Sequence, residues 1–194
     1  ILSKTKIELK TIVATSGLRP YFFGKKYNFK SASTSQDYVF KDPSINTIFI
    51  ATRHDSHAEL VIKSLKNGKN IFVEKPLCIN KQELKKIEKT YKESYSENVK
   101  KEINPPTLMI GFNRRFSPYI KSIKSELDKY KDPKSFIYTV NAGFIPKNHW
   151  VHDNKIGGGR LIGEACHFVD LIMYLAGSKI KTVDIVKAKD QKIS

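Results

Sequence analysis

The chain has 194 residues, of which 40% are hydrophobic and 28% are charged, and its formal net charge is +16. This composition is typical of a folded globular protein and excludes intrinsic disorder as the default interpretation. No run of about 20 apolar residues could form a membrane helix, and the first residues lack the apolar block of a signal peptide. We therefore expect a cytoplasmic protein without a membrane span.

The strong positive charge is compatible with nucleic-acid binding, which needs clustered basic residues. Here the lysines are spread along predicted helices with glutamates at helical spacing, as in residues 81–94, "KQELKKIEKTYKES". We expect a solvated lysine-rich surface that attracts anionic ligands, and no nucleic-acid partner. Cys78 and Cys166 have no neighbours at metal-site spacing, so free thiols and no metal are expected.

The first 45 residues predict short elements. Residues 7–14 alternate like a strand that ends in the turn 15–17, "TSG". A short helix is expected over 21–26, an extended link over 32–34, and a helical turn in "DYVFKDPSI", residues 37–45, stopped by its proline.

The middle of the chain alternates between strands and helices. Residues 46–52 form a continuous apolar run, which is typical of a parallel strand covered on both faces. A helix from Ser56 to Gly68 and a second buried strand at 70–73 complete a βαβ unit. A helix over 81–100 and a strand over 107–112 follow, as in an α/β fold with a doubly wound parallel sheet.

The C-terminal part has a different pattern. An amphipathic helix is predicted over 117–130, and a second helix over 159–176. Alternating strands are predicted over 135–144 and 181–189, as in an α+β domain with an open, mostly antiparallel sheet. We therefore place a Rossmann-type domain at residues 1–115 and an incomplete second domain at 116–194.

A dinucleotide-binding sheet opens with a strand and a GxGxxG turn, whose backbone amides hold the pyrophosphate. The sequence contains no such motif and begins with Ile1. We expect a fragment that lacks this opening unit and part of its C-terminal sheet. On that interpretation the 194-residue chain by itself binds cofactor poorly.

Polar side chains follow three of the predicted parallel strands, in segments 51–57, 74–76 and 111–116. The carboxyl ends of neighbouring parallel strands meet at one edge, where open α/β sheets bind ligands. We therefore expect the three segments to border one crevice.

Lys75 is the candidate proton-transfer group at this edge. A partly desolvated ammonium group is disfavoured, so the lysine pKa can fall towards neutrality. Pro76 follows directly, and an X-Pro bond can be cis and fix the direction of the lysine. The spacing alone also fits a solvent-exposed lysine at a strand end.

His167 is the second candidate, because imidazole titrates near neutrality. A single helical histidine is also commonly a satisfied core residue. Glu164 lies three residues earlier and shares its helical face, which permits acid–base pairing. A GluxxHis pair alone is weak evidence for a metal.

Residues 48–77, 108–118 and 157–171 together resemble the Gfo/Idh/MocA family of NAD(P)-dependent oxidoreductases. The second and third segments are similar to bi-domain members that are fused to, or encoded with, a zinc-type alcohol dehydrogenase unit. The resemblance implies hydride transfer between a nicotinamide, of NAD or NADP, and a secondary alcohol carbon of a sugar, sugar nucleotide or cyclitol. It also implies a homo-oligomer of the full-length protein, because relatives often pair through the open sheet of the second domain.

The resemblance assigns roles to residues of this sequence. Lys75 matches the lysine that hydrogen-bonds the reacting oxygen, and His167 matches the second acid–base residue. The expected cofactor-binding residues are Thr15, Ser16, Ala51, Thr52, Arg53, His57, Glu74, Lys75 and Pro76. The expected substrate-binding residues are Arg114, Arg115, Trp150, Glu164 and His167. A bidentate arginine would suit an anionic sugar or a phosphate.

Two positions depart from the family pattern. Gly163 stands four residues before His167, where the family has an aspartate, and Glu164 is about 100° further around a helix. The turn 15–17 replaces the acidic residue that holds the ribose, which leaves both NAD and NADP open. Three functions therefore stay open: a sugar or cyclitol oxidoreductase, a nucleotide-binding homologue without turnover, and a basic nucleic-acid-binding module.

Overall fold

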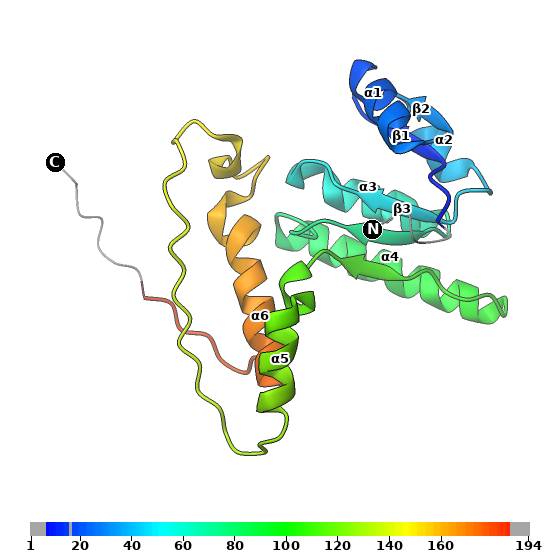
Figure 1. The fold of residues 1–194 in the computed structure, drawn as a ribbon. Coiled ribbons are helices and arrows are strands. Elements are labelled where there is room, and N and C mark those ends of the chain that lie inside the picture. Colours follow the sequence, from blue (N-terminus) through cyan, green and yellow to red (C-terminus); the bar gives the residue numbers. More distant parts are fainter. Residues whose placement is uncertain (1–6, 16, 187–194) are drawn as a thin grey trace.

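The structure is a computed structural model that describes residues 7–15 and 17–186. Its first part consists of parallel strands with helices, and its last part is built around two helices, α5 and α6, that lie side by side (Figure 1). A long extended segment runs beside α6 and leads into it.

The N-terminal elements form a two-stranded parallel sheet. Strand β1, Thr11–Val13, pairs with β2, Ser31–Ser33, across helix α1, Leu18–Tyr27. Strand β1 is shorter than the strand predicted over 7–14, and α1 is longer than the helix predicted over 21–26. The extended link predicted over 32–34 is largely strand β2. Residues 31–33 become strand β2 because their backbone hydrogen-bonds to β1. Such pairing is a tertiary contact that local sequence does not encode. The helical turn predicted next is confirmed as α2, Asp37–Lys41.

The predicted βαβ unit is confirmed and extends to a three-stranded sheet. Its elements in chain order are β3, Thr47–Ile50; α3, His54–Lys66; β4, Asn70–Val73; α4, Lys81–Lys100; and β5, Leu108–Ile110. All pairs are parallel, and the spatial order is β3-β4-β5. The sequence predicts one doubly wound sheet, whereas the described residues form two separate parallel sheets.

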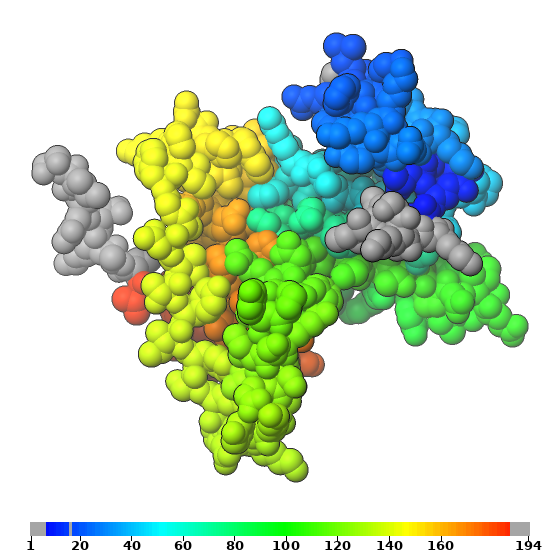
Figure 2. Space-filling model, viewed as in Figure 1, coloured from blue at the N-terminus to red at the C-terminus, as the bar shows by residue number. Residues whose placement is uncertain are grey.

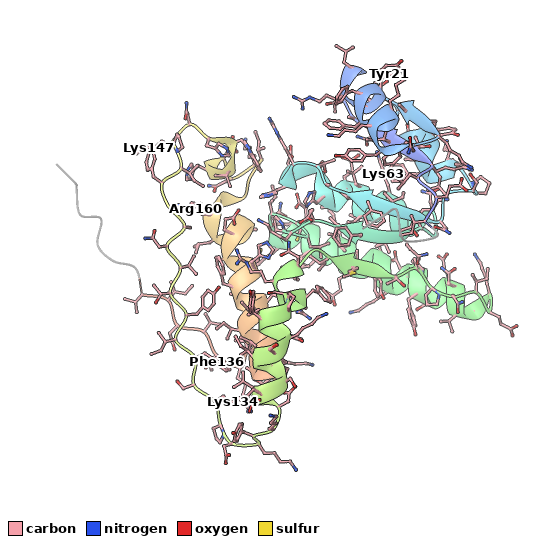
Figure 3. All side chains as sticks on the ribbon, viewed as in Figure 1. Tyr21, Lys63, Lys134, Phe136, Lys147 and Arg160 are labelled. Carbon is pink, nitrogen blue, oxygen red and sulfur yellow. The ribbon has the colours of Figure 1, made fainter. Side chains whose placement is uncertain are left out.

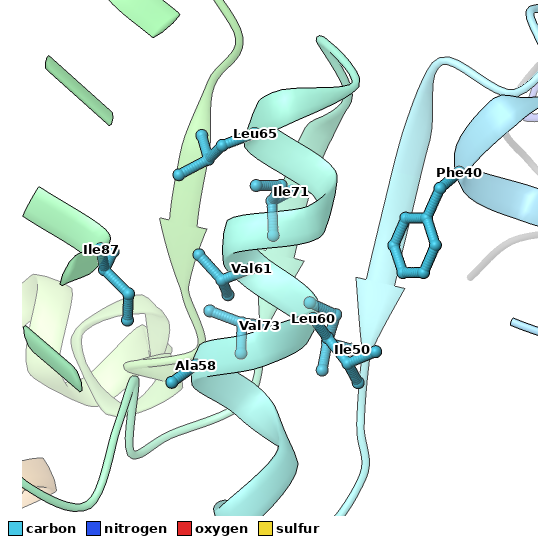
Figure 4. Packing of buried hydrophobic residues seen from close by; sticks show 9 residues of the cluster. All are labelled: Phe40, Ile50, Ala58, Leu60, Val61, Leu65, Ile71, Val73 and Ile87. Carbon is cyan, nitrogen blue, oxygen red and sulfur yellow. The ribbon is translucent and has the colours of Figure 1, made fainter. Parts of the chain in front are cut away.

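The core lies between this sheet and helices α3 and α4 (Figure 4). It consists of Phe40, Ile50, Ala58, Leu60, Val61, Leu65, Ile71, Val73 and Ile87. On the opposite face of β3, Phe49 is 66% exposed and stacks on Phe72 with ring centroids 5.3 Å apart. The prediction that β3 is covered on both faces is therefore wrong for the described residues, because α3 and α4 pack on the same face.

Helix α4 begins where the sequence predicts, because its first turn is capped. The side chain of Asn80 accepts a hydrogen bond from the backbone N–H of Glu83 at 2.9 Å. The carboxylate of Glu83 in turn accepts from the N–H of Ile79 at 3.0 Å. These reciprocal bonds satisfy two backbone donors at the start of the helix and fix the path of the chain from β4.

The two predicted C-terminal helices are confirmed. After the 3-10 turn η2, Asn113–Phe116, comes α5, Pro118–Leu127, with proline at its first position. The second helix starts with a π-helical turn, η4, Leu161–Ala165, and continues as α6, Cys166–Ala176. It ends at Gly177, whose φ of +68° is a left-handed conformation that favours glycine.

The predicted strands over 135–144 and 181–189 are wrong for the residues that the structure describes. Residues 135–144 and 181–186 have no strand partner, and 187–189 lie outside the described residues. Alternation indicates a half-buried surface, but a strand also needs a neighbour for its backbone hydrogen bonds. Instead, Arg160 (labelled in Figure 3) donates to the carbonyls of Gly143 at 2.9 Å and Ala142 at 3.1 Å. The domain division at residue 115 stays a prediction.

Candidate active site at the carboxyl ends of the parallel strands

The ends of β3, β4 and β5 bring three segments of the chain to one edge. Ile50 is paired with Val73, and Val73 with Ile110, so the residues that follow each strand emerge next to one another. Gly111 lies so close to Glu74 that an added Cβ would be 3.0 Å from its carboxylate oxygen. The absence of a side chain at Gly111 therefore makes room for Glu74.

The segment after β3 is open to solvent. Ala51, Thr52 and Arg53 are exposed, and the hydroxyl of Thr52 hydrogen-bonds that of Ser56 at 2.6 Å. The guanidinium of Arg53 lies over the ring of Trp150, 5.8 Å from its centroid. These residues are available to a ligand at the strand edge, as the sequence predicts for Ala51 to Arg53, and their cofactor contacts stay a prediction.

His57 is fully buried and connects two strand ends. Its Nδ1 lies 2.7 Å from the carbonyl oxygen of Pro76, and its Nε2 lies 3.1 Å from that of Thr52. The Lys75–Pro76 bond in this turn is cis. Because its two ring nitrogens face the carbonyls of Pro76 and Thr52, His57 joins the turn after β4, which carries Lys75, to the end of β3.

Lys75 reaches from the end of β4 to the start of the last helix. Its Nζ donates to the carbonyl of Gly163 at 2.7 Å and to Oε1 of Glu164 at 3.1 Å. The Lys75 side chain is only 15% exposed, whereas that of Glu164 is 39% exposed. The ammonium group is thus fixed by a main-chain oxygen and a carboxylate that belong to a distant part of the sequence.

His167 is buried on the same helical face as Glu164, with 7% of its surface exposed. Its ring meets Phe112 edge to face, with centroids 6.2 Å apart. Burial lowers the pKa of His167, and the positive charges of Lys75 and Arg114 lower it further. The imidazole is therefore neutral at neutral pH and can accept a proton.

The Nδ1 atom of His167 has no hydrogen-bond partner, and among the described residues it is the single buried side-chain polar atom of which this is true. A buried polar group without a partner is costly, so such a group calls for an explanation. A bound ligand that supplies the missing bond would explain it. The site therefore holds an unused polar atom that a bound ligand could satisfy, as a cofactor or substrate site would.

The two predicted substrate arginines differ in their surroundings. Arg115 donates to both carboxylate oxygens of Asp170, from Nε at 3.0 Å and from Nη2, and lies over the ring of Tyr174. Arg114 is exposed, and its guanidinium lies 4.7 Å from the ring centroid of Phe168. Arg115 thus ties η2 to α6, whereas Arg114 forms no salt bridge with any residue that the structure describes. Substrate binding by either arginine stays a prediction.

Trp150 belongs to a short turn, η3, Trp150–His152, which contacts the start of α3. Its ring meets the ring of His54 edge to face at 4.9 Å. His54, which sequence reasoning missed, is the first residue of α3, and its Nδ1 hydrogen-bonds the carbonyl of Gly157 at 2.9 Å. Figure 2 shows the start of α3 (cyan) packed against this part of the chain.

The two N-terminal site residues are predicted near the other sheet, which contains β1. Thr15 is exposed just after β1, and Ser16 lies outside the described residues. Their predicted cofactor contacts therefore stay untested. Of the predicted site residues, the structure brings Lys75, Glu164 and His167 together.

Helix α6 has a second, apolar face that borders an open groove of about 640 Å³. Residues Tyr138 and Val140 of the extended segment form one wall, and Phe168 and Ile172 of the helix form the other. Glu164 lies at the boundary between this groove and the Lys75 contact. Lys75 and His167 do not line this groove, so the groove is distinct from the candidate active site.

Among the described residues no three His, Cys, Asp or Glu side chains gather as a metal site would require. Both cysteines are free thiols, as predicted, and burial raises the pKa of each. Within the described ranges no helix has the length and apolar character to cross a membrane.

Open parallel α/β sheets bind ligands at the carboxyl ends of their strands, and Lys75 follows β4 at that edge, with His167 of α6 nearby. Residues 2–97 match the model of the Gfo/Idh/MocA oxidoreductase family, which is described as having an NAD-binding Rossmann fold. The chain belongs to this family.

Several of the similar proteins are named as dehydrogenases. The chain is 33% identical over 148 residues to a scyllo-inositol 2-dehydrogenase (NAD(+)) of Bacillus subtilis, which covers 75% of this chain and 39% of that protein. It is 24% identical over 159 residues to a myo-inositol 2-dehydrogenase of Thermotoga maritima, which covers 82% of this chain and 44% of that protein. The chain therefore spans less than half the length of these curated relatives.

Solved structures show the same fold. A levoglucosan dehydrogenase in complex with NADH and levoglucosan aligns with a TM-score of 0.67 at 23% identity, over 88% of this chain and 46% of that one. A probable dehydrogenase from Thermotoga maritima aligns with a TM-score of 0.69 at 22% identity, over 92% and 51%.

Proposed function

We propose that the protein is an NAD-dependent oxidoreductase that acts on a secondary alcohol of a sugar or cyclitol. The observation that carries the proposal is the contact of Lys75 with Gly163 and Glu164, which lie four and three residues before the buried His167. This arrangement brings a hydrogen-bond donor, Lys75, to a helical segment that carries a carboxylate and a neutral imidazole. The family description and the names of the inositol and levoglucosan dehydrogenases support the same reaction class.

The cofactor would lie along the exposed segment after β3, at Ala51, Thr52 and Arg53, with Glu74 and Pro76 beside it. When bound, it supplies a nicotinamide C4 that takes up or gives back a hydride. NAD is our choice because the family and a curated relative are both named for it. NADP is the alternative cofactor, because the turn that begins at Thr15 replaces the acidic residue that would hold the ribose of NAD.

The residues of this chain handle the proton. In alcohol oxidation, the C–H electron pair leaves as hydride while the O–H proton passes to a base, and a C=O bond forms. Lys75 would hydrogen-bond the reacting oxygen, held in place by the Gly163 carbonyl. His167, neutral because burial lowers its pKa, would accept the proton, and Glu164 would stabilise the ammonium of Lys75.

The proposal is tested by incubating the whole protein with NAD and a panel of cyclitols and anhydrosugars, with NADH formation as the readout. Steady NADH formation with at least one polyol is expected. Tight NAD binding without turnover across the panel would favour a nucleotide-binding homologue instead. Affinity for DNA or RNA that falls steeply with salt would favour the basic nucleic-acid module. A small-molecule substrate follows from the proposal, whereas homo-oligomer formation, the absence of a nucleic-acid partner and a cytoplasmic location stay predictions.

A further inference from the structure

His54 occupies space that a side chain at Gly163 would take. An added Cβ at Gly163 would lie 3.0 Å from Cε1 of His54 and 3.4 Å from its Nδ1. Contacts at 3.0 Å force a neighbour to move, so even alanine at position 163 would disturb the imidazole. The glycine and the histidine are therefore complementary in shape, and His54 is 8% exposed in the resulting niche.

The orientation of the His54 ring is fixed. Its Nδ1 lies 2.9 Å from the carbonyl oxygen of Gly157, and a carbonyl only accepts hydrogen bonds, so Nδ1 carries the hydrogen. The Trp150 ring packs edge to face against the imidazole at an interplanar angle of 77°. In the neutral ring the remaining nitrogen, Nε2, consequently holds a lone pair in a defined direction.

Nε2 of His54 is open to a ligand. Within the described part of the chain it makes no hydrogen bond, whereas Nδ1 does. Among the described residues, Nδ1 of His167 is the one buried side-chain polar atom without a partner. Nε2 of His54 also has no partner but is not such an atom, so part of its surface reaches solvent. Burial lowers the pKa of His54 more than its bond to Gly157 raises it. The ring is therefore an uncharged hydrogen-bond acceptor at neutral pH.

His54 and Lys75 act on the same backbone unit. The Cα of Gly163 faces His54, and the carbonyl of Gly163 accepts the hydrogen bond from Lys75 at 2.7 Å. The electric field of Lys75 also contributes to the low pKa of His54. The imidazole of His54 and the ammonium group of Lys75 therefore both lie against Gly163.

We propose that Nε2 of His54 accepts a hydrogen bond from a second hydroxyl of the polyol substrate and so selects which carbon is presented to Lys75. This inference rests on the proposed function and names a specificity-determining residue for it. An uncharged acceptor recognises a neutral polyhydroxylated molecule, because a hydroxyl donates the hydrogen bond without an accompanying charge. A site that hydrogen-bonds a substrate hydroxyl strongly rejects the analogue that lacks it.

The decisive variant is His54→Asn in the whole protein. The amide of asparagine can keep the donor to Gly157 but places no acceptor where Nε2 lies. We expect the KM for the preferred polyol to rise at least about 10-fold with a smaller change in kcat. One monodeoxy analogue should be rejected by the natural protein at least about 10-fold, and His54→Asn should abolish that difference. His152→Asn, at an exposed histidine, is the matched control and should retain both properties.

Imidazole ¹⁵N NMR gives a readout that does not need turnover. Saturating myo-inositol, or the best polyol of the panel, should shift the Nε2 resonance of His54 and leave that of His152 unchanged. No shift at saturation, or a His54→Asn variant with unaltered KM and deoxy discrimination, would overturn the inference. A shift without NADH formation would support His54 as a polyol ligand and contradict the proposed oxidoreductase. NADH formation by the natural protein together with an unaffected His54→Asn variant would support the oxidoreductase and contradict the role of His54.

Discussion

The ammonium group of Lys75 donates a hydrogen bond to the main-chain oxygen of Gly163, 88 residues further along the chain, at 2.7 Å. This contact joins the end of β4 to the helical segment that carries Glu164 and His167. Because the acceptor is a main-chain oxygen, a side-chain substitution at position 163 does not directly remove this hydrogen bond. The candidate site therefore depends on how the two parts of the chain pack, as well as on its residue types.

Glu164→Gln tests the role of the carboxylate beside Lys75. Glutamine keeps the volume and one acceptor oxygen, while the charge that faces Nζ at 3.1 Å is lost. Because Gly163 still holds the lysine, we expect kcat to fall by about 10-fold rather than to vanish, equivalent to about 1.4 kcal/mol of transition-state stabilisation. Steady-state kinetics over a range of pH measure the effect. An unchanged kcat and pH profile would show that the carboxylate has no part in proton transfer.

The buried histidine should make stability depend on pH. Burial lowers the pKa of folded His167 below its ordinary value of 6.5, so in the window between the folded and unfolded pKa values the unfolded chain binds more protons. The free energy of unfolding is then highest above about pH 6.5 and falls as the pH drops through this window. Burial lowers the pKa of His54 as well, which adds a contribution of the same sign.

Urea unfolding at about pH 7.5 and about pH 5 measures this loss. His167→Gln should lose less stability on acidification than the natural protein, because glutamine does not titrate. His152→Gln, at an exposed position, serves as the control and should retain the natural pH dependence. Equal losses in the natural protein and His167→Gln would contradict the assignment.

Arg115 and Asp170 should stabilise the packing of η2 against α6. The carboxylate is 10% exposed and the guanidinium 35%, so solvent screens the pair in part. We expect Asp170→Asn to lower the free energy of unfolding by about 1–2 kcal/mol, and Arg115→Lys to lower it less because one donor remains. A double-mutant cycle in urea should give a positive coupling energy. The exposed pair Lys129–Glu126 is the comparison, where Lys129→Met should change nothing measurable.

Periodicity predicts the fold well where each element is long or continuously apolar. Helices α3 and α4 and strand β4 lie within two residues of their predicted positions because their burial pattern repeats locally. Strand β2 has no such pattern: Ser31 and Ala32 are exposed, and only pairing with β1 defines the strand. For residues 135–144 the prediction fails in the other direction. Their apolar and polar residues alternate as in a strand, but no strand lies beside them in the described residues.

The site could be predicted in the same uneven way. Lys75 and His167 follow from a family resemblance, and the parallel order of β3, β4 and β5 explains why the strand ends meet. His54 could not be identified, because a histidine at a helix start carries no signal of its own. The missing side chain at Gly163 was the only sequence clue, and its meaning depends on a contact across 109 residues.

The fit between His54 and Gly163 predicts a non-additive effect on stability. Gly163→Ala should destabilise the protein by about 1–3 kcal/mol, because its Cβ would be 3.0 Å from Cε1 of the imidazole. His54→Ala in the same chain removes the clash, so the double variant should be more stable than the sum of the single effects indicates. Urea unfolding of all four proteins measures the coupling. Strict additivity would mean that the two residues do not touch.

The central claim is that Lys75 hydrogen-bonds the reacting oxygen during hydride transfer, and single-turnover kinetics of Lys75→Met test it most directly. The whole protein, saturated with NAD and its best polyol, should transfer hydride about 10²- to 10⁴-fold more slowly after this substitution. Lys81→Met, at an exposed lysine that begins α4, should retain the natural rate. A Lys75→Met protein that is folded, binds NAD and transfers hydride at the natural rate would contradict the account.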